Sequence, residues 1–329
     1  MKYLSLFSWI GGFELWLQQA YEQIMDVSST TREQSMMMDT SWTRSDTEQK
    51  QVGMEQPHCI WFSEIDKYAT AVYQSHFPNH HAYGDITKID AESLPDFDML
   101  CGWFPCQAFS IAWKRLWFAD TRGTLFFEIA RILEAKQPRL LFLENVKGLL
   151  SHDEWRTFKT ILATLTELGY DLQWQVLNSK NHGVPQNRER VFIVWHLRGT
   201  PRPEVFPFWE SNGKTIIQLN KPKHSNDRVY GTDGLSPTLN TMQGGNRQPF
   251  ISKTVRSGGR SSPHGSKQNW DSYEYQWQIR RLTPTECERL QGFPDGWTKI
   301  VSDSQRYKCC GNAVTVNVIQ DIAIRLLTP

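Results

Sequence analysis

The sequence lacks a hydrophobic run long enough to cross a membrane and lacks a charged-then-apolar leader, so we expect a soluble protein of the cytoplasm. It also lacks an excess of charge of one sign, because 36 Lys and Arg residues balance 35 Asp and Glu residues to a formal net charge of +1. The overall charge therefore does not indicate a polyanionic partner. A length of 329 residues, with 39% hydrophobic residues, allows a large core and more than one domain.

Paired cysteine motifs are absent as well. No cysteine belongs to a CxxC, and no histidine stands at zinc spacing from one, so we predict no metal site. The pattern favours reduced thiols. The cysteines are Cys59, Cys101, Cys106, Cys287, Cys309 and Cys310.

Strand-like and helix-like segments alternate through the first two-thirds of the chain. This alternation is typical of an α/β fold with a parallel or mostly parallel sheet, covered by helices on both faces. Apolar runs predict strands at residues 3–7, 58–64, 97–101, 139–146, 170–177 and 190–196, with a further strand end at 83–86. Helical spacing predicts helices at 13–24, 67–76, 124–136, 155–168 and 314–327.

Two segments depart from this pattern. Residues 26–56 are polar and have little periodicity, which predicts an inserted surface loop. Residues 211–270 contain nine basic residues against two acidic ones, and this turn-rich stretch is either a solvated surface or a contact for a phosphate backbone. We therefore predict a large domain at 1–198, a small turn-rich domain at 199–302, and a C-terminal segment at 303–329 that returns to the large domain.

Reactive side chains follow several of the predicted strands. Cys106, Glu64, Asp85 and Glu144 all stand where α/β sheets bind their ligands, at the carboxyl ends of strands. Each has a structural alternative, because a lone cysteine is usually a small buried apolar residue and the acids are common helix caps. The glycine pair at residues 11–12 suits a nucleotide-binding turn but is weak support alone, since tight turns use the same residues.

Six motifs in a fixed order narrow these alternatives. They are Leu6-Phe-Ser-Trp-Ile-Gly-Gly-Phe13, Phe104-Pro-Cys-Gln-Ala-Phe-Ser110, Glu144-Asn-Val146, Gln186-Asn-Arg-Glu-Arg190, the run 281–295 beginning Arg-Leu-Thr-Pro, and Gly311-Asn-Ala-Val314. With them, the chain resembles the DNA (cytosine-5)-methyltransferases of bacterial restriction–modification systems and phages. The resemblance implies a Rossmann-like methyltransferase sheet, S-adenosyl-L-methionine as cofactor, and double-stranded DNA as substrate.

The resemblance also implies the chemistry. Carbon 5 of cytosine is a poor nucleophile, and Cys106 would activate it by adding its thiolate to carbon 6. Glu144, with a pKa raised by burial, would donate a proton to ring nitrogen 3. Arg188 and Arg190 would hold the base carbonyl, a phosphate or Glu144 itself. The base must be flipped out of the duplex to reach these groups.

Two further sets of residues follow from the resemblance. Residues 199–278 would form the target-recognition region, braced by residues 281–297. The cofactor pocket would be lined by Phe7, Gly11, Gly12, Glu64, Asp85, Ile86, Pro105, Leu125, Asn312 and Val314. The expected DNA contacts are Ser110, Arg247, Lys253, Arg256 and Arg260. We expect a monomer, with a cognate restriction endonuclease as a further partner.

Tryptophan stands at five positions where the family usually has glycine: Trp9, Trp16, Trp103, Trp113 and Trp117. An indole in the cofactor turn or beside the nucleophile is expected to obstruct binding or strain the loop. Because the departures are of one type, we hypothesise that the source organism reads UGA as glycine. UGG codons at these positions would refute this. Other tryptophans, such as Trp61, Trp155 and Trp297, are interpreted as ordinary apolar residues.

Two alternative functions remain open. Genuine tryptophans in the motif loops would make the chain a catalytically impaired, DNA-binding relative. The tRNA-directed branch of the same fold is the second alternative, and the sizeable basic segment argues against it because that branch is expected to have a smaller one.

Overall fold

The computed structural model describes residues 1–38, 55–105, 125–201, 203–209, 214–222, 224, 227–240, 248–252 and 279–328. The chain divides into two compact units. Unit 1 comprises Met1–Leu177, Arg190–Phe208 and Val318–Pro329, and unit 2 comprises Asn178–Glu189 and Trp209–Asn317.

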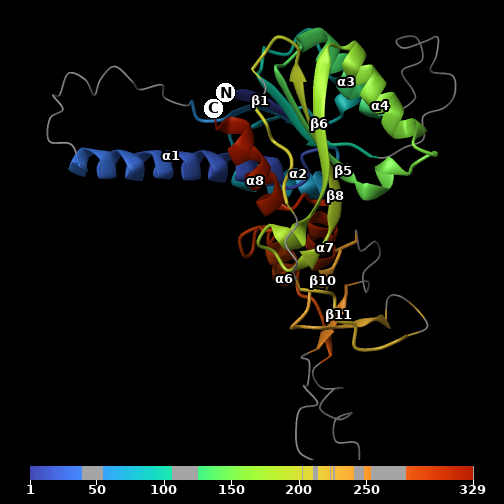
Figure 1. The fold of residues 1–329 in the computed structure, drawn as a ribbon. Helices are drawn as coiled ribbons and strands as arrows, with labels where there is room; N and C mark the ends of the chain where they lie inside the picture. The colour runs from blue at the N-terminus through green and yellow to red at the C-terminus, as the bar shows by residue number, and fades with distance from the viewer. Residues whose placement is uncertain are drawn as a thin grey trace, which may run out of the picture. The chain divides into compact units, whose positions relative to one another are not determined.

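Unit 1 is built on a sheet whose strands β1, β5, β6 and β8 are labelled in Figure 1. The described strands run in the order β3-β2-β1-β4-β5-β8-β6. The pairs β1–β2, β1–β4, β2–β3 and β4–β5 are parallel, whereas β5 and β8 are antiparallel. The mostly parallel α/β sheet predicted from the sequence is thus confirmed. The strands are β1 (Lys2–Leu6), β2 (His58–Ser63), β3 (His81–Ala82), β4 (Met99–Trp103), β5 (Leu140–Val146), β6 (Tyr170–Asn178) and β8 (Glu189–Leu197).

Helices cover both faces of this sheet. Alternate residues of a strand face opposite sides, so Leu141 and Leu143 join a buried cluster with α3 (Leu125–Lys136) and α4 (Arg156–Glu167). Phe142 faces the other way and packs edge-on against Phe13 and Trp16 of α1 (Gly12–Met38). α2 (Lys67–His76) covers β2 on the same side as α1, with its Tyr73 stacked on Phe62. α8 (Val316–Leu327) lies beside α1, where Gln320 donates a hydrogen bond to Gln23.

Residues 203–208 are held against the edge strand β6 by side chains. The Gln173 amide donates to the carbonyl of Pro203 at 2.9 Å and accepts from the amide of Val205 at 3.0 Å. Gln175 makes the equivalent pair with both backbone groups of Phe208, at 2.7 and 2.8 Å. This segment therefore belongs to unit 1, although residues 199–208 were predicted to lie in the small domain.

The described residues of unit 2 form short strands and two helices. β7 (Gln186–Asn187) pairs in parallel with β10 (Ser236–Pro237). β11 (Phe250–Ser252) pairs with β9 (Val229–Gly231) and with β12 (Arg280–Arg281). The helices are α6 (Pro284–Leu290), which begins with a capping box between Thr283 and Glu286, and α7 (Asp303–Asn312). Short 3-10 turns are η1 (Ile86–Lys88) and η3 (Lys147–Leu150) in unit 1, and η4 (Ser179–Asn181) in unit 2.

The structure corrects two predictions. α1 continues through Met38, so the loop predicted from residue 26 is wrong for residues 26–38, which contain no Gly or Pro to end the helix. Residues 39–54 lie outside the described part of the chain. The predicted domain boundaries also differ from the observed units: residues 178–189 and 303–317 belong to unit 2, because β7 pairs with β10 and α7 packs on α6.

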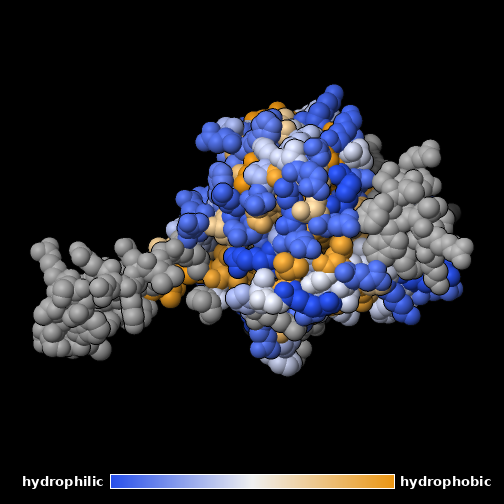
Figure 2. All heavy atoms as spheres, turned by 90° about the horizontal axis from the view of Figure 1, so that it is seen from above, coloured by the Kyte–Doolittle hydropathy of each residue, from blue (hydrophilic) through white to orange (hydrophobic). Residues whose placement is uncertain are grey.

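The surface is mixed in character. The face drawn in Figure 2 is mostly hydrophilic, with hydrophobic residues scattered among the charged ones. Within the described residues, no helix combines the length and the apolar character needed to span a membrane.

Candidate active site

Five of the predicted site residues lie at one edge of the unit 1 sheet. Phe7 follows β1, Glu64 follows β2, Asp85 precedes η1 beyond β3, Pro105 comes two residues after β4, and Glu144 lies near the end of β5. Because these strands are parallel, their carboxyl ends meet at the same edge. This is the edge at which open α/β sheets bind ligands.

The turn after β1 has an unusual backbone. Phe7 and Trp9 have φ values of 52° and 48°, in the left-handed region that favours glycine, and Gly11 follows with φ 83°. A Cβ on Gly11 would lie 2.5 Å from the Phe77 ring, so glycine is required there for space as well as for φ. The turn ends at Gly12, the first residue of α1.

The Glu64 carboxylate holds this turn to the next strand end. Its Oε2 accepts a hydrogen bond from the Trp9 amide at 3.1 Å, and its Oε1 accepts from the amides of Ile65 and Asp66 at 2.9 and 2.8 Å. Burial raises the pKa of Glu64, and these backbone hydrogen bonds partly oppose that rise. Glu64 is thus a well-oriented acceptor beside the glycine turn, as a ribose contact requires.

Asp85 has the structural role that the sequence left open. It caps η1, and its Oδ1 accepts from the backbone amide and the hydroxyl of Thr87 at 3.0 and 2.8 Å, which lowers the pKa of Asp85. Ile86 is buried at 2% exposure, and Leu125 begins α3.

Glu144 and Arg190 form an ion pair near the carboxyl end of β5. The Arg190 Nε lies 3.0 Å from Glu144 Oε1, and the Glu144 side chain is 2% exposed. The antiparallel register of β5 and β8, in which Val146 is opposite Arg190, places the two side chains at this edge. Of the alternatives raised by the sequence, Arg190 holding Glu144 is the one observed in this structure.

Asn145 is a site residue that the sequence analysis missed. Its buried amide donates to the carbonyl of Phe104 at 2.7 Å, and its Oδ1 accepts from the amide of Val146 at 2.8 Å. Asn145 therefore anchors the backbone just before Pro105, which precedes the proposed nucleophile Cys106 in the sequence. The motif Glu144-Asn-Val146 was the available signal, but the sequence assigned chemistry only to its acid.

Several predicted residues lie outside the described part of the chain. They include the proposed nucleophile Cys106 and the five expected DNA contacts, Ser110, Arg247, Lys253, Arg256 and Arg260. Trp113 and Trp117 also lie outside it.

Arg188 is placed differently from Arg190. It belongs to unit 2, is 2% exposed, and its guanidinium donates to backbone carbonyls of Leu239, Gly311 and Ala313. Asn312 and Val314, the expected cofactor contacts near the C-terminus, lie in the same unit. In this structure Arg188 thus holds protein backbone, and its predicted catalytic contact with a base or phosphate stays a prediction.

Glu14 is a second residue that the sequence analysis did not single out. It lies in the first turn of α1 and is 2% exposed. Neither carboxylate oxygen makes a well-formed hydrogen bond with a described residue, although the Ser5 and Tyr73 hydroxyls lie nearby. Burial raises the pKa of Glu14 to about 7, against a smaller lowering from those hydroxyls. The Ser5 hydroxyl accepts from Ser8 in the glycine turn at 2.8 Å, which links Glu14 to the turn.

The motif tryptophans that the structure describes differ among themselves. The Trp9 and Trp103 rings meet edge to face, with centroids 6.1 Å apart, over the carboxyl ends of β1 and β4. Trp16 is fully buried against Phe13 and Phe142. The indole N–H groups of Trp9 and Trp16 are buried and have no hydrogen-bond partner among the described residues, an unfavourable state for a polar group.

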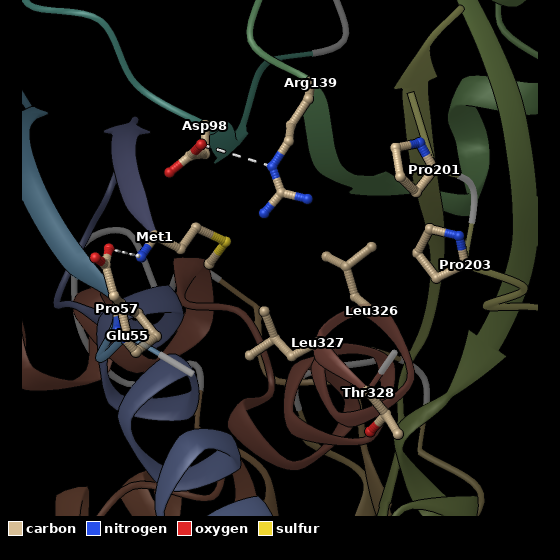
Figure 3. A pocket seen from close by; sticks show the side chains of 10 residues that line it. All are labelled: Met1, Glu55, Pro57, Asp98, Arg139, Pro201, Pro203, Leu326, Leu327 and Thr328. Carbon is tan, nitrogen blue, oxygen red and sulfur yellow. Dashed lines mark hydrogen bonds and ion pairs between the residues drawn. The ribbon is translucent and has the colours of Figure 1, made fainter. Parts of the chain in front are cut away.

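The opposite edge of the same sheet contains a cavity of about 580 Å³ (Figure 3). Met1, Pro57, Asp98 and Arg139 line it, and each immediately precedes a parallel strand. Its charged residues are paired: Arg139 lies 3.6 Å from Asp98, and the N-terminal ammonium lies 3.4 Å from Glu55. None of the residues predicted for the site lines this cavity.

Comparison with known proteins identifies the family. The sequence model of the C-5 cytosine-specific DNA methylases matches residues 1–328. The Type II methyltransferase M1.ScrFI of Lactococcus lactis subsp. cremoris is 39% identical over 289 residues, which cover 83% of this chain and 73% of that protein. The Type II methyltransferase M.NlaX of Neisseria lactamica is 35% identical, with 98% and 95% coverage.

Solved structures agree at the level of the fold. The S. pombe Dnmt2 methyltransferase matches with a TM-score of 0.64 at 17% identity, covering 99% of this chain and 98% of that one. A putative DNA modification methyltransferase encoded within an E. coli prophage matches with a TM-score of 0.60 at 16% identity, covering 99% and 98%. The Rossmann-like methyltransferase fold implied by the sequence is thereby confirmed.

Proposed function

The chain belongs to the C-5 cytosine-specific DNA methylase family, and from that premise we propose that Cys106, Glu144 and Arg190 perform its methyl transfer to carbon 5 of cytosine in double-stranded DNA. The observation that supports this assignment most directly is the buried Glu144–Arg190 ion pair near the carboxyl end of β5. A buried acid held by a guanidinium is oriented before the base arrives, so little reorganisation is needed during the reaction.

The proposed reaction begins with the Cys106 thiolate, which forms a bond to carbon 6 of the flipped-out cytosine. The electron pair of the carbon 5–carbon 6 double bond moves into the ring. Glu144, which takes up a proton from solvent before the base binds, donates it to nitrogen 3 as negative charge develops there. Arg190 keeps the Glu144 carboxyl aimed at the base. After carbon 5 is methylated, water accepts the carbon 5 proton, and the double bond re-forms as the Cys106 thiolate leaves carbon 6. Nitrogen 3 then returns its proton to Glu144.

The cofactor of this family is S-adenosyl-L-methionine, which supplies an electrophilic methyl group. The acceptors at the carboxyl edge fit its nucleoside, because Glu64 presents an oriented carboxylate for ribose hydroxyls and Asp85 an acceptor for an adenine amino group. Glycine at position 11 lets the turn lie against the Phe77 ring, which fixes the backbone of the turn beside Glu64. We assign Phe7, Gly12, Ile86, Pro105, Leu125, Asn312 and Val314 to the same pocket.

We further propose that the basic segment after residue 211 binds the DNA, with Arg247, Lys253, Arg256 and Arg260 on phosphates and Ser110 at the base. The enzyme would act as a monomer alongside a cognate restriction endonuclease. Support for that partner is that the relatives are methyltransferases of Type II systems.

A triple variant tests the DNA contacts. Replacing Lys253, Arg256 and Arg260 by Ala should weaken DNA binding and flatten its dependence on salt, because fewer counterions are released from the DNA. The measurement is the dissociation constant for duplex DNA at several salt concentrations. Unchanged affinity and slope would make the segment an ordinary solvated surface.

An impaired relative is the second candidate, favoured by the Trp9–Trp103 ring contact over the strand ends where the cofactor should bind. Bisulfite sequencing of plasmid DNA distinguishes the two. Cells would express the chain with its tryptophans, a version with glycine at all five motif positions, and a Cys106→Ser version of each. The five positions are Trp9, Trp16, Trp103, Trp113 and Trp117.

We expect methylation that depends on Cys106 in at least the glycine version. Methylation that persists in the Cys106→Ser version would rule out Cys106 as the nucleophile. No methylation by either parent would leave only the impaired, DNA-binding relative or the tRNA-directed branch.

A further inference from the structure

The two terminal nitrogens of Arg188 donate hydrogen bonds to backbone carbonyls that come from distant parts of unit 2. Its Nη1 lies 3.3 Å from the carbonyls of Leu239 and Gly311, and its Nη2 lies 3.3 and 2.9 Å from those of Gly311 and Ala313. A guanidinium has four N–H groups on its two terminal nitrogens, so these four contacts engage all of them. None of the four is left to hold a base or a phosphate.

Two of the three carbonyls lie at the end of a helix. α7 ends at Asn312 with Ala313 as its C-cap, and the last carbonyls of a helix lack intrahelical donors and have partial negative charge. The positive guanidinium satisfies Gly311 and Ala313 at this point. It therefore fixes the backbone on both sides of Asn312, one of the proposed cofactor contacts.

The third carbonyl belongs to another segment. Leu239 follows β10 and leads toward residues 241–247, which include the proposed phosphate contact Arg247. Arg188 is itself fixed in place, because its amide donates to Asn178 Oδ1 at 3.2 Å and its carbonyl accepts from the Ser179 amide at 3.0 Å. One buried cation thus joins the segment proposed to contact the cofactor to the segment that leads to the DNA contacts.

We infer that Arg188 is a positioning residue that couples cofactor binding to DNA binding, and that it does not touch the cytosine. The inference rests on the proposed cofactor contact of residues 311–314. Coupling between two ligands is reciprocal, so each should bind more tightly when the other is present, and loss of the link should remove part of that gain.

The experiment uses the form of the chain that methylates plasmid DNA, either the one with the motif tryptophans or the one with glycine in their place. The Kd of S-adenosylhomocysteine is measured with and without that DNA for the parent, Arg188→Lys and the matched control Arg190→Lys. For Arg188→Lys, we expect the factor by which DNA tightens S-adenosylhomocysteine binding to be at least fivefold smaller than in the parent. We also expect KM to rise while kcat is kept. Arg190→Lys should lower kcat and keep the coupling. A hundredfold fall in kcat for Arg188→Lys with coupling intact would overturn the inference.

A measurement on the unmutated chain covers the case in which Arg188 variants fail to fold. Hydrogen exchange is followed with and without S-adenosylhomocysteine, and we expect protection to increase in peptides covering both 311–316 and 236–240. Protection of 311–316 alone would overturn the inference. Protection in neither these peptides nor 7–14 would instead overturn the proposed cofactor pocket.

A separate observation concerns Trp155, which the sequence led us to interpret as an ordinary apolar residue. It is 49% exposed, has φ 70°, and occupies the N-cap of α4 without a side-chain capping bond. A bulky residue in the left-handed region is an outlier, and an N-cap normally has a short polar side chain or glycine. The earlier interpretation of Trp155 is therefore wrong.

We propose that Trp155 belongs with the motif tryptophans as a UGA codon that the source organism reads as glycine. The codon at this position in the source gene decides it: UGA supports the proposal and UGG overturns it. As a physical test, Trp155→Gly should raise Tm by about 2 °C or more, since it relieves the backbone strain. The control is Trp174→Gly on strand β6, an exposed tryptophan packed on Phe158, which should lower Tm. A fall in Tm for Trp155→Gly would remove the strain argument.

Discussion

The two edges of the unit 1 sheet are formed by the same parallel strands, yet they differ in burial and in backbone geometry. At the carboxyl edge, Glu64 and Glu144 are at most 8% exposed, and Phe7 and Trp9 have positive φ. At the amino edge, Arg139 and Asp98 form an ion pair whose side chains are 45% and 41% exposed (Figure 3). No described residue that lines that cavity has a positive φ, although Gln137, two residues before Arg139, has φ 43°.

The difference shows where this fold concentrates unfavourable free energy. A residue held in a sparsely populated backbone region costs about 1–3 kcal/mol, and a buried acid adds a desolvation cost. Such features persist only where the surrounding structure holds them in place. At the carboxyl edge the hydrogen bonds of Glu64 and Asn145 provide that support, as expected of an edge that binds a ligand and reacts.

The largest effect should follow from Glu144→Gln. It removes the proton donor at the carboxyl edge, so the single-turnover methylation rate should fall about 10²–10⁴-fold, a few kcal/mol, while cofactor affinity is kept. The matched control is Glu288→Gln in unit 2, where Glu288 is buried and paired with Arg306 at 3.1 Å. That change should lower Tm and leave the rate within a few-fold. Collapse of cofactor binding in Glu144→Gln, with the rate retained, would contradict the assignment.

Glu14, which is linked to the glycine turn at the carboxyl edge, should make the stability of the fold depend on pH. Burial raises the pKa of Glu14 from 4.5 to about 7, so the folded state holds a proton that the unfolded state releases above pH 4.5. The associated stability is fully present below pH 4.5 and is lost as pH rises through 7, a change on the order of 3 kcal/mol. Glu14→Gln should abolish this part of the pH dependence in denaturant titrations from pH 4.5 to 8, whereas exposed Glu22→Gln on the same helix should preserve it. Equal slopes for both variants would contradict a buried proton at Glu14.

The sequence predicted the order of strands and helices and the acids at the strand ends, because these depend on local periodicity and on strand direction. It could not distinguish Arg188 from Arg190, although they are two residues apart. The carbonyls that Arg188 binds come from residues 51 to 125 positions away, whereas the partner of Arg190 is set by the pairing of β5 with β8.

Burial was equally hard to predict for single residues. Glu14 stands at the start of a helix, where an acid is expected to interact with the helix dipole at the surface, and no local pattern indicates that it is covered. Trp16 is a second case, because the register of α1 on β5 places its indole in the core against Phe142, and no local pattern distinguished it from Trp9.

Replacing Trp9 and Trp103 by Gly should increase cofactor affinity at the carboxyl edge. Removing the two contacting rings frees the turn and relieves the positive φ of Trp9, so S-adenosylmethionine should bind at least tenfold more tightly, a gain of ~1.4 kcal/mol or more. Trp16→Gly is the control, since it should lower Tm by opening a cavity and should change cofactor affinity less. Calorimetric titration measures all three. Equal affinities would show that the indoles are accommodated, and would weaken the case for recoded codons.

The smallest effect on stability and activity should follow from a substitution at the amino edge. Arg139→Ala breaks an ion pair that is about half exposed, and such pairs contribute about 0–1 kcal/mol to stability because solvent screens them and both side chains lose freedom. Nothing in the proposed reaction requires this edge, since the proposed catalytic and cofactor residues do not line the cavity. Cofactor affinity and the methylation rate should therefore stay within twofold of the parent, measured by the same calorimetric and single-turnover assays. A tenfold loss in either would show that the amino edge takes part in function, and the contrast between the two edges would then not separate reactive from structural residues.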